Sequence, residues 1–256
     1  MLNRIELKQG AKAVTRSASV SAYRFTFIYL LVVAVLNGAD NYMRLTDSLV
    51  VYMDGQFVNI GAYLPFTHAP FPTVAVVFVG VLVWLLGSVL RAGWVLYHQG
   101  VRRGEEMPYS TLFDGFGFTG KIILLNLVTG LFVFLWSLLL VIPGIIAIYR
   151  YRFALYNLCE NPELGVMDAL RLSKQQTVGF KLDLFVLDVT FIGWGLLCGL
   201  TLGILSIWIQ PYRAQTDIGF FQQIKAIKGI GWRNTPPHDD TFRPNDPFGG
   251  TNNPWQ

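Results

Sequence analysis

The chain has 256 residues, of which 53% are hydrophobic and only 14% are charged, and its mean hydropathy is +0.44. Soluble globular domains carry about a quarter charged residues, so this composition excludes an ordinary soluble protein. The net charge of +4 does not indicate nucleic-acid binding, because the basic residues are spread between apolar runs. Cys159 and Cys198 are expected at opposite ends of the fold and therefore unpaired.

Long apolar runs predict an all-α fold, a polytopic transmembrane bundle of about six spans. With both termini in the cytoplasm, Arg44 is the only one of 20 Lys and Arg residues on the outer side. This asymmetry is the positive-inside pattern of a membrane protein. The spans are expected at about 23–39, 73–97, 119–142, 144–159, 182–201 and 203–223.

The other segments are assigned around this membrane domain, which covers residues 23–228. Residues 1–22 form a basic cytoplasmic segment, either an amphipathic helix or a solvated tail. An outer loop is expected at 40–72, and residues 229–256 are rich in Pro, Asn and Asp, which predicts a disordered cytoplasmic tail. Asn161 and Pro162 are typical of a helix start, which predicts an interfacial helix over 161–176.

Pro143 and Gly144 predict a helix break that ends the third span, because proline disfavours helix before it and glycine permits a turn. The apolar run after the break has only about fourteen residues, or about 21 Å of helix, against a hydrocarbon core of about 30 Å. It is therefore either a short span or one leg of a hairpin that begins below the outer surface.

Ionisable residues near membrane depth are the main candidates for a polar site, because charges there are usually paired or face a watery cavity. Asp188 is the most deeply placed acid, and we expect it to pair with Arg152 or Arg213. Arg150 points away from Arg152 on a helix. A structural ion pair is favoured over a polar pathway or ligand site. The candidate network is Arg150, Arg152, Asp188 and Arg213.

Two glycine patterns have structural interpretations. Gly115, Gly117, Gly120 and Lys121 fit phosphate-loop spacing, but no strand precedes them and Ile122 replaces the Ser or Thr that binds magnesium. We therefore expect a flexible loop. Gly195, Gly199 and Gly203 recur every four residues, which favours close helix packing inside the bundle or at a dimer face.

Several motifs resemble an uncharacterised bacterial integral membrane family, domain of unknown function 975. The resemblance implies a multi-span membrane protein, mostly of Gram-positive bacteria, with no established activity and no catalytic residue. Its matching residues include Leu135–Leu139, Ile142–Ile146, Asn161–Pro162 with Ala169 and Ser173, Phe191–Trp194, Leu200–Gly203 and Pro211–Tyr212, together with Asn3–Lys8 and Arg103–Glu106.

The function expected from the sequence is that of a non-enzymatic scaffold or accessory protein of the cell membrane. The alternative is a small transporter or channel with a polar site at the broken hairpin, because transporters use broken helices and buried charges. No cofactor, metal site or catalytic motif is predicted. The expected partners are the lipid bilayer and other membrane proteins but no nucleic acid, and the oligomeric state is left open.

Overall fold

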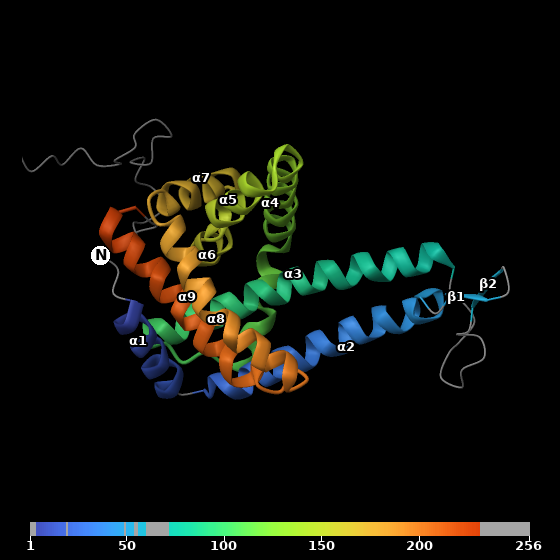
Figure 1. Ribbon diagram of the computed structural model, residues 1–256. Coiled ribbons are helices and arrows are strands. Elements are labelled where there is room, and N and C mark those ends of the chain that lie inside the picture. The colour runs from blue at the N-terminus through green and yellow to red at the C-terminus, as the bar shows by residue number, and fades with distance from the viewer. Residues whose placement is uncertain (1–3, 19, 49, 54–55, 60–71, 231–256) are drawn as a thin grey trace, which may run out of the picture.

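The computed structural model describes residues 4–18, 20–48, 50–53, 56–59 and 72–230, and nearly all of them are helical (Figure 1). The expected outer loop beyond residue 59 and the expected tail beyond residue 230 lie outside the described residues. The helices are α1 (Arg4–Ser17), α2 (Ala22–Ser48), α3 (Thr73–Arg103), the 3-10 helix η2 (Tyr109–Phe118), α4 (Thr119–Leu139), α5 (Val141–Tyr151), α6 (Ala154–Glu160), α7 (Val166–Thr177), α8 (Lys181–Leu200) and α9 (Ser206–Lys228).

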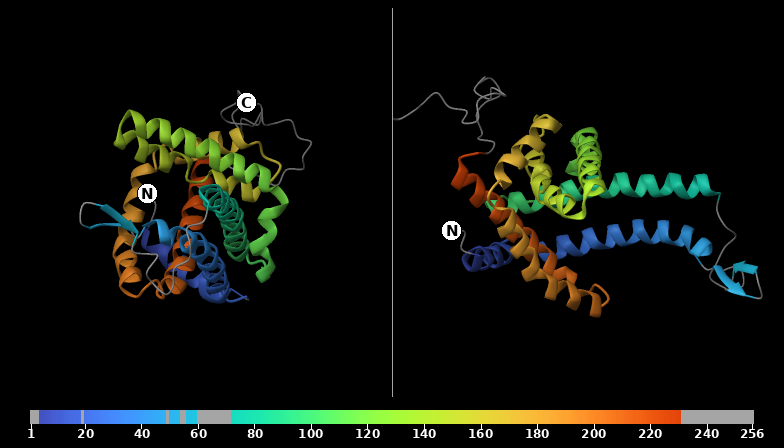
Figure 2. Two further views of the ribbon diagram at one scale, coloured as in Figure 1. Left: turned by 90° about the vertical axis from the view of Figure 1, so that its right-hand side faces the viewer. Right: turned by 45° about the horizontal axis from the view of Figure 1, so that its top comes forward.

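Helices α2 and α3 form a long antiparallel arm that projects from the rest of the protein (Figures 1 and 2). Two short strands, β1 (Val50–Met53) and β2 (Gln56–Asn59), pair antiparallel at its far end. Residues 73–90 of α3 contain no charged side chain. At about 1.5 Å per residue they extend about 27 Å, close to the thickness of the hydrocarbon core.

Two further hairpins, α4/α5 and α8/α9, leave the same region in other directions. The left view of Figure 2 looks along α2 and α3 and shows α4 and α8 along their lengths. The tips of these two hairpins are apolar and exposed, with Leu140 at 66% and Leu202 at 93%. The described helices therefore do not form one bundle of parallel spans.

The hairpins meet at a packed region that we call the base. It comprises α1, η2, α6, α7, the C-terminal parts of α3 and α9 and the N-terminal parts of α2, α4 and α8. It holds the three hydrophobic clusters of the described residues. The N-terminal segment is an amphipathic helix there, because Leu7 and Ala11 are buried while Lys12 and Arg16 are exposed. This outcome decides between the two alternatives that the sequence left open.

Four helical segments are long and apolar enough to cross a membrane: residues 22–44, 73–103, 109–139 and 181–200. They correspond to the first, second, third and fifth expected spans. The fourth expected span, 144–159, is divided between α5 and α6. The sixth, 203–223, corresponds to α9, whose polar residues Gln210, Arg213 and Asp217 lower its hydropathy. The count of six is thus not reproduced by the described helices.

The helix break of the α4/α5 hairpin lies at Leu140, which corrects the predicted break at Pro143 and Gly144. Leu140 has an extended backbone (φ −166°, ψ 153°), and α5 begins at the next residue. Pro143 is in the first turn of α5, where its missing N–H leaves no intrahelical bond unmade. Gly144 has a packing role, since a Cβ there would lie 2.2 Å from Ser137 Oγ in α4.

The expected helix over 161–176 also begins later than the sequence suggests. Asn161 Oδ1 accepts a hydrogen bond from the Glu163 N–H and closes a turn, and α7 starts five residues downstream at Val166. One face of α7 is buried against the protein, while Arg171 and Lys174 remain exposed. Asn161 caps a local turn because Asn side chains satisfy nearby backbone N–H groups in turns as readily as at helix ends.

Two glycines allow η2 to pack against α3, so the segment expected to be a flexible loop is an ordered helix. A Cβ on Gly93 would lie 2.1 Å from the backbone oxygen of Leu112, and one on Gly115 would lie 2.6 Å from the backbone oxygen of Val89. Both obstacles are backbone atoms and cannot rotate away. The side-chain-free surface of these glycines is therefore what brings the two helices together.

Replacing Gly93 with alanine is expected to lower the melting temperature in detergent, because overpacking of this kind costs about 1–3 kcal/mol. Gly87→Ala in the same helix is the matched control, since a Cβ there meets nothing within 4 Å. The control should be neutral or stabilising, because alanine is the better helix former. Equal melting temperatures for the two variants would contradict the close approach of η2 and α3.

Candidate polar site at the base

A second helix break, between α5 and α6, creates the site. Residues Arg152 and Phe153 interrupt the helix, which leaves backbone groups near the break without their usual partners. Ser173 of α7 substitutes for them. Its hydroxyl donates to the Arg150 carbonyl at 2.9 Å and accepts from the Phe153 N–H at 3.1 Å. Thr177 of α7 also donates to the Arg150 carbonyl, at 3.3 Å. The break is therefore a stable feature, held by two buried side chains of α7.

The Arg152 guanidinium, placed at this break, joins two acids from different helices. Its Nη1 donates to Asp188 Oδ2 at 2.5 Å and its Nη2 donates to Asp188 Oδ1 at 3.0 Å, a bidentate arrangement. Nη2 also donates to Asp217 Oδ1 at 2.9 Å. The three side chains are only 17%, 22% and 13% exposed. Bidentate charge-assisted bonds of this kind are strong and directional, so they fix the positions of α8 and α9 relative to the break.

Two more groups complete the coordination of Asp188. Tyr149 donates its hydroxyl to Asp188 Oδ2 at 3.0 Å, and Arg213 Nη2 donates to Oδ1 at 3.1 Å. Asp188 therefore contacts both arginines that the sequence suggested as partners. Arg213 is 48% exposed and lies at the edge of this cluster. We call Arg152, Asp188, Asp217, Arg213 and Tyr149 the Arg152 network.

The edge of the network continues onto α1 through the buried ring of Phe191. Lys8 Nζ lies 4.9 Å from the ring centroid and donates to Thr190 Oγ1 at 2.7 Å. The Arg213 guanidinium lies 5.8 Å from the same centroid. Two cations from different helices thus lie within 6 Å of the centroid of one aromatic ring, a favourable arrangement for each.

Further polar contacts lock α6, α7 and α9 to one another. Asn157 and Gln176 are fully buried and exchange two amide hydrogen bonds of 2.9 and 3.0 Å. Lys225 of α9 forms an ion pair with Glu160 of α6. Lys228 donates to the Gln175 and Val178 carbonyls at the C-terminal end of α7, where free carbonyls favour a cation.

Several residues singled out from the sequence lie elsewhere. Arg150 is not joined to the Arg152 network by any described contact, and its Nε is buried without a hydrogen-bond partner among the described residues. The expected packing of Gly195, Gly199 and Gly203 inside the bundle is absent, since a Cβ on any of them would meet no described atom within 4 Å. The alternative of a dimer face stays a prediction. Gly203 has φ +86° and belongs to the α8/α9 turn.

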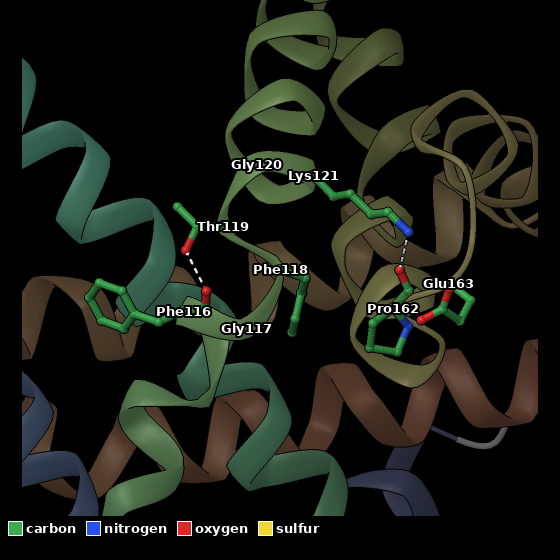
Figure 3. Close-up of a pocket in the computed structure, with 8 residues that line it drawn as sticks. All are labelled: Phe116, Gly117, Phe118, Thr119, Gly120, Lys121, Pro162 and Glu163. Carbon is green, nitrogen blue, oxygen red and sulfur yellow. Dashed lines mark hydrogen bonds between the residues drawn. The ribbon is translucent and has the colours of Figure 1, made fainter.

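The glycine-rich stretch before α4 lines a shallow hollow of about 620 Å³ (Figure 3). Lys121 does not project freely into it, because its ammonium donates to the Pro162 carbonyl at 2.5 Å. Glu163 lies on the opposite wall and opposes an anion. The hollow therefore lacks the free cation of a phosphate loop. Among the described residues, no three His, Cys, Asp or Glu side chains converge to hold a metal ion.

Comparison with known proteins identifies the part of the chain that carries this site. Residues 137–228 match the family described as "Protein of unknown function (DUF975)". This part of the chain is similar to that family. It includes α5 to α9 and so contains every member of the Arg152 network. The expected family motifs at residues 3–8, 103–106 and 135–136 lie outside the match. No curated protein and no solved structure matches the chain.

Sequence reasoning did not find the contribution of α1 and α7 to the site. Lys8 was visible only as one of several basic residues before the first span, and Ser173 only as part of a family motif. Their partners lie 182 and at least 20 residues away in the chain. Hydrophobic periodicity reports which face of a helix is buried, but it does not report which distant backbone group a hydroxyl meets.

The pairing of Arg152 with Asp188 predicts strong energetic coupling. A double-mutant cycle with Arg152→Gln and Asp188→Asn measures this coupling. The double variant should lose less free energy of unfolding than the two single variants lose together, and the difference should be about 1–3 kcal/mol. Thermal unfolding in detergent measures this. Arg171 and Asp168, an exposed pair at 3.4 Å, provide the control cycle, with an expected coupling below about 0.5 kcal/mol. Plain additivity at Arg152 and Asp188 would show that they do not interact.

Ser173→Ala should destabilise the protein by about 1–3 kcal/mol, because it leaves the buried Phe153 N–H at the break without its hydrogen-bond partner. Ser88→Ala is the control, since the Ser88 hydroxyl only adds a bond to the Trp84 carbonyl within α3. Denaturant or thermal unfolding of both variants checks this. Similar small effects would mean that the break does not need Ser173.

Proposed function

We propose that this is a non-enzymatic accessory protein of the cell membrane. The two helices of the α2/α3 arm cross the membrane, and the other two hairpins are inserted only into the leaflet beside the base. The observation that supports this arrangement is the length of the charge-free runs. Residues 122–149 of the α4/α5 hairpin and residues 189–212 of the α8/α9 hairpin lack charged side chains. Two crossings need about 40 apolar residues, so neither run is long enough to cross and return.

Two polar helices support the same placement. Helix α7 packs on the α4 residues Ile122 and Leu125 and exposes 62% of the Arg171 side chain. Leu7 of helix α1 shares a hydrophobic cluster with Leu184 and Leu187 of α8, and α1 exposes Lys12 and Arg16. Exposed charges are costly in hydrocarbon. The parts of α4 and α8 that carry these helices therefore belong at the head-group level, and only the hairpin ends enter the apolar layer.

The arm is long enough to cross, unlike the two hairpins. Its apolar stretch in α3 is about 27 Å, and Asp40 and Arg44 form an ion pair at 3.0 Å towards its far end. We propose that this end faces outward and that both termini and the base are cytoplasmic, as the distribution of basic residues predicts. The six apolar segments of the sequence then comprise two crossing helices and two non-crossing hairpins.

The closed Arg152 network supports an accessory role over transport. Its two acids are each bonded to arginine, and its contacts join the α5–α6 break, α8 and α9. A substrate that entered would have to break these bonds. Two surface hollows, one beside Lys121 and one beside Val77, are lined by residues outside the network. A rigid base of this kind suits a protein that holds or regulates other membrane proteins through its exposed apolar helices.

Cysteine labelling tests the arrangement. In a Cys198→Ala background, Leu140→Cys and Leu202→Cys should not react with membrane-impermeant thiol reagents added outside intact cells, because the tips stay within the bilayer. Gln56→Cys at the far end of the arm is the positive control, since Gln56 is exposed. Outside labelling of either tip residue, at the rate seen for Gln56→Cys, would contradict the non-crossing hairpins.

The accessory role has its own test. A tagged chain solubilised in mild detergent should retain a specific membrane protein, and Arg152→Gln should reduce this retention because it loosens the base. Reconstituted vesicles provide the opposing measurement. Solute flux that requires Arg152 and Asp188 would support the transporter instead.

A further inference from the structure

The edge of the Arg152 network has more positive charge than its acids neutralise. Among the described residues, Arg152 and Arg213 contact two carboxylates, Asp188 and Asp217, and Lys8 is connected to them through Phe191. The connected group therefore carries one net positive charge. The surplus lies on the exposed side, because Arg152 is largely buried between both acids while Arg213 is 48% exposed.

Lys8 is the cation with the weakest compensation. Its described hydrogen bond goes to the neutral Thr190 hydroxyl, whose own proton is directed to the Leu187 carbonyl at 2.6 Å. Partial burial lowers the pKa of Lys8 below its usual value, since a charged ammonium is less well solvated there. Arg213, the other cation beside Phe191, has one described hydrogen bond, from Nη2 to Asp188. Each cation can therefore donate to a further acceptor.

The position of this pair determines the kind of anion. Lys8 and Arg213 lie within 6 Å of the centroid of the Phe191 ring. Directly beyond them the α8/α9 hairpin becomes charge-free, with Ile192 and Leu196 exposed. An anion with attached apolar chains suits such a boundary, because its charge meets the cations while its chains lie along the hairpin. The phosphate of an anionic phospholipid has this chemistry.

We propose that Lys8 and Arg213, both next to the Phe191 ring, form a binding site for the phosphate of an anionic phospholipid. This inference rests on the membrane placement proposed above. The phosphate accepts hydrogen bonds from the Lys8 ammonium and the Arg213 guanidinium, and its single charge balances the surplus of the network. The lipid thereby holds α1 against α8 and α9 at the surface of the leaflet.

Native mass spectrometry of the full-length protein in detergent tests the site with phosphatidylglycerol as the probe and phosphatidylcholine as the comparison. The wild-type protein should bind phosphatidylglycerol more tightly. Lys8→Gln and Arg213→Gln should each weaken that binding about fivefold, the effect of one basic residue at an anionic membrane surface. Lys8→Arg should retain it, and Lys174→Gln, which removes an exposed charge from α7, should leave it unchanged.

The outcomes separate the possibilities. Equal binding of the two lipids, or equal losses in Lys8→Gln and Lys174→Gln, would overturn the site. Inorganic phosphate provides a second comparison. If it stabilises the wild-type protein against heat as much as phosphatidylglycerol does, and Lys8→Gln loses this stabilisation, the site binds a soluble anion and the lipid assignment is wrong. Far-ultraviolet circular dichroism verifies that each variant is folded. The cysteine-labelling result does not depend on lipid affinity, so failure of this site and failure of the membrane placement are distinguishable.

Discussion

The pairing of Arg152 with Asp188 and Asp217 is the interaction on which the rest of the base depends. A guanidinium paired with two carboxylates is stable where water or lipid head groups can solvate its exposed edge. Removing one partner leaves an uncompensated buried charge. The network lies where α1, the α5–α6 break, α8 and α9 meet. It therefore determines how far the apolar parts of the hairpins extend from the polar base.

This constraint explains why one hydrophobic chain has two kinds of hairpin. In the α2/α3 arm, the part of α3 before Arg91 is about 27 Å long and carries no charge. In the other two hairpins, the return helices α5 and α9 reach a charged residue, Arg150 or Arg213, after a shorter apolar stretch. In the proposed arrangement the arm spans the hydrocarbon core, and the other two hairpins enter only part of it. The exposed tips at Leu140 and Leu202 are suited to lipid chains and not to an aqueous surface.

The sequence predicts the helical membrane class, the family of residues 137–228, and the short return leg of the α4/α5 hairpin. These features depend on local composition and run length. The position of the break does not, because Pro143 is tolerated in the first turn of α5 and the chain reverses at Leu140 instead. Likewise, the break at Arg152 depends on Ser173 of α7, and the ordered packing of η2 depends on backbone atoms that face Gly93 and Gly115. Such long-range contacts have no local sequence signal.

The most direct test of the account is the depth of the hairpin tips in a bilayer. Spin labels at Leu140 and Leu202 of the reconstituted protein can be placed by their relaxation with oxygen and with a water-soluble paramagnet. Both tips should lie in the apolar layer, no deeper than about the bilayer midplane. Oxygen should then relax the spin labels strongly, and the water-soluble paramagnet should relax them weakly. Labels that lie at the opposite head groups would contradict the account, because the hairpins would then cross the membrane.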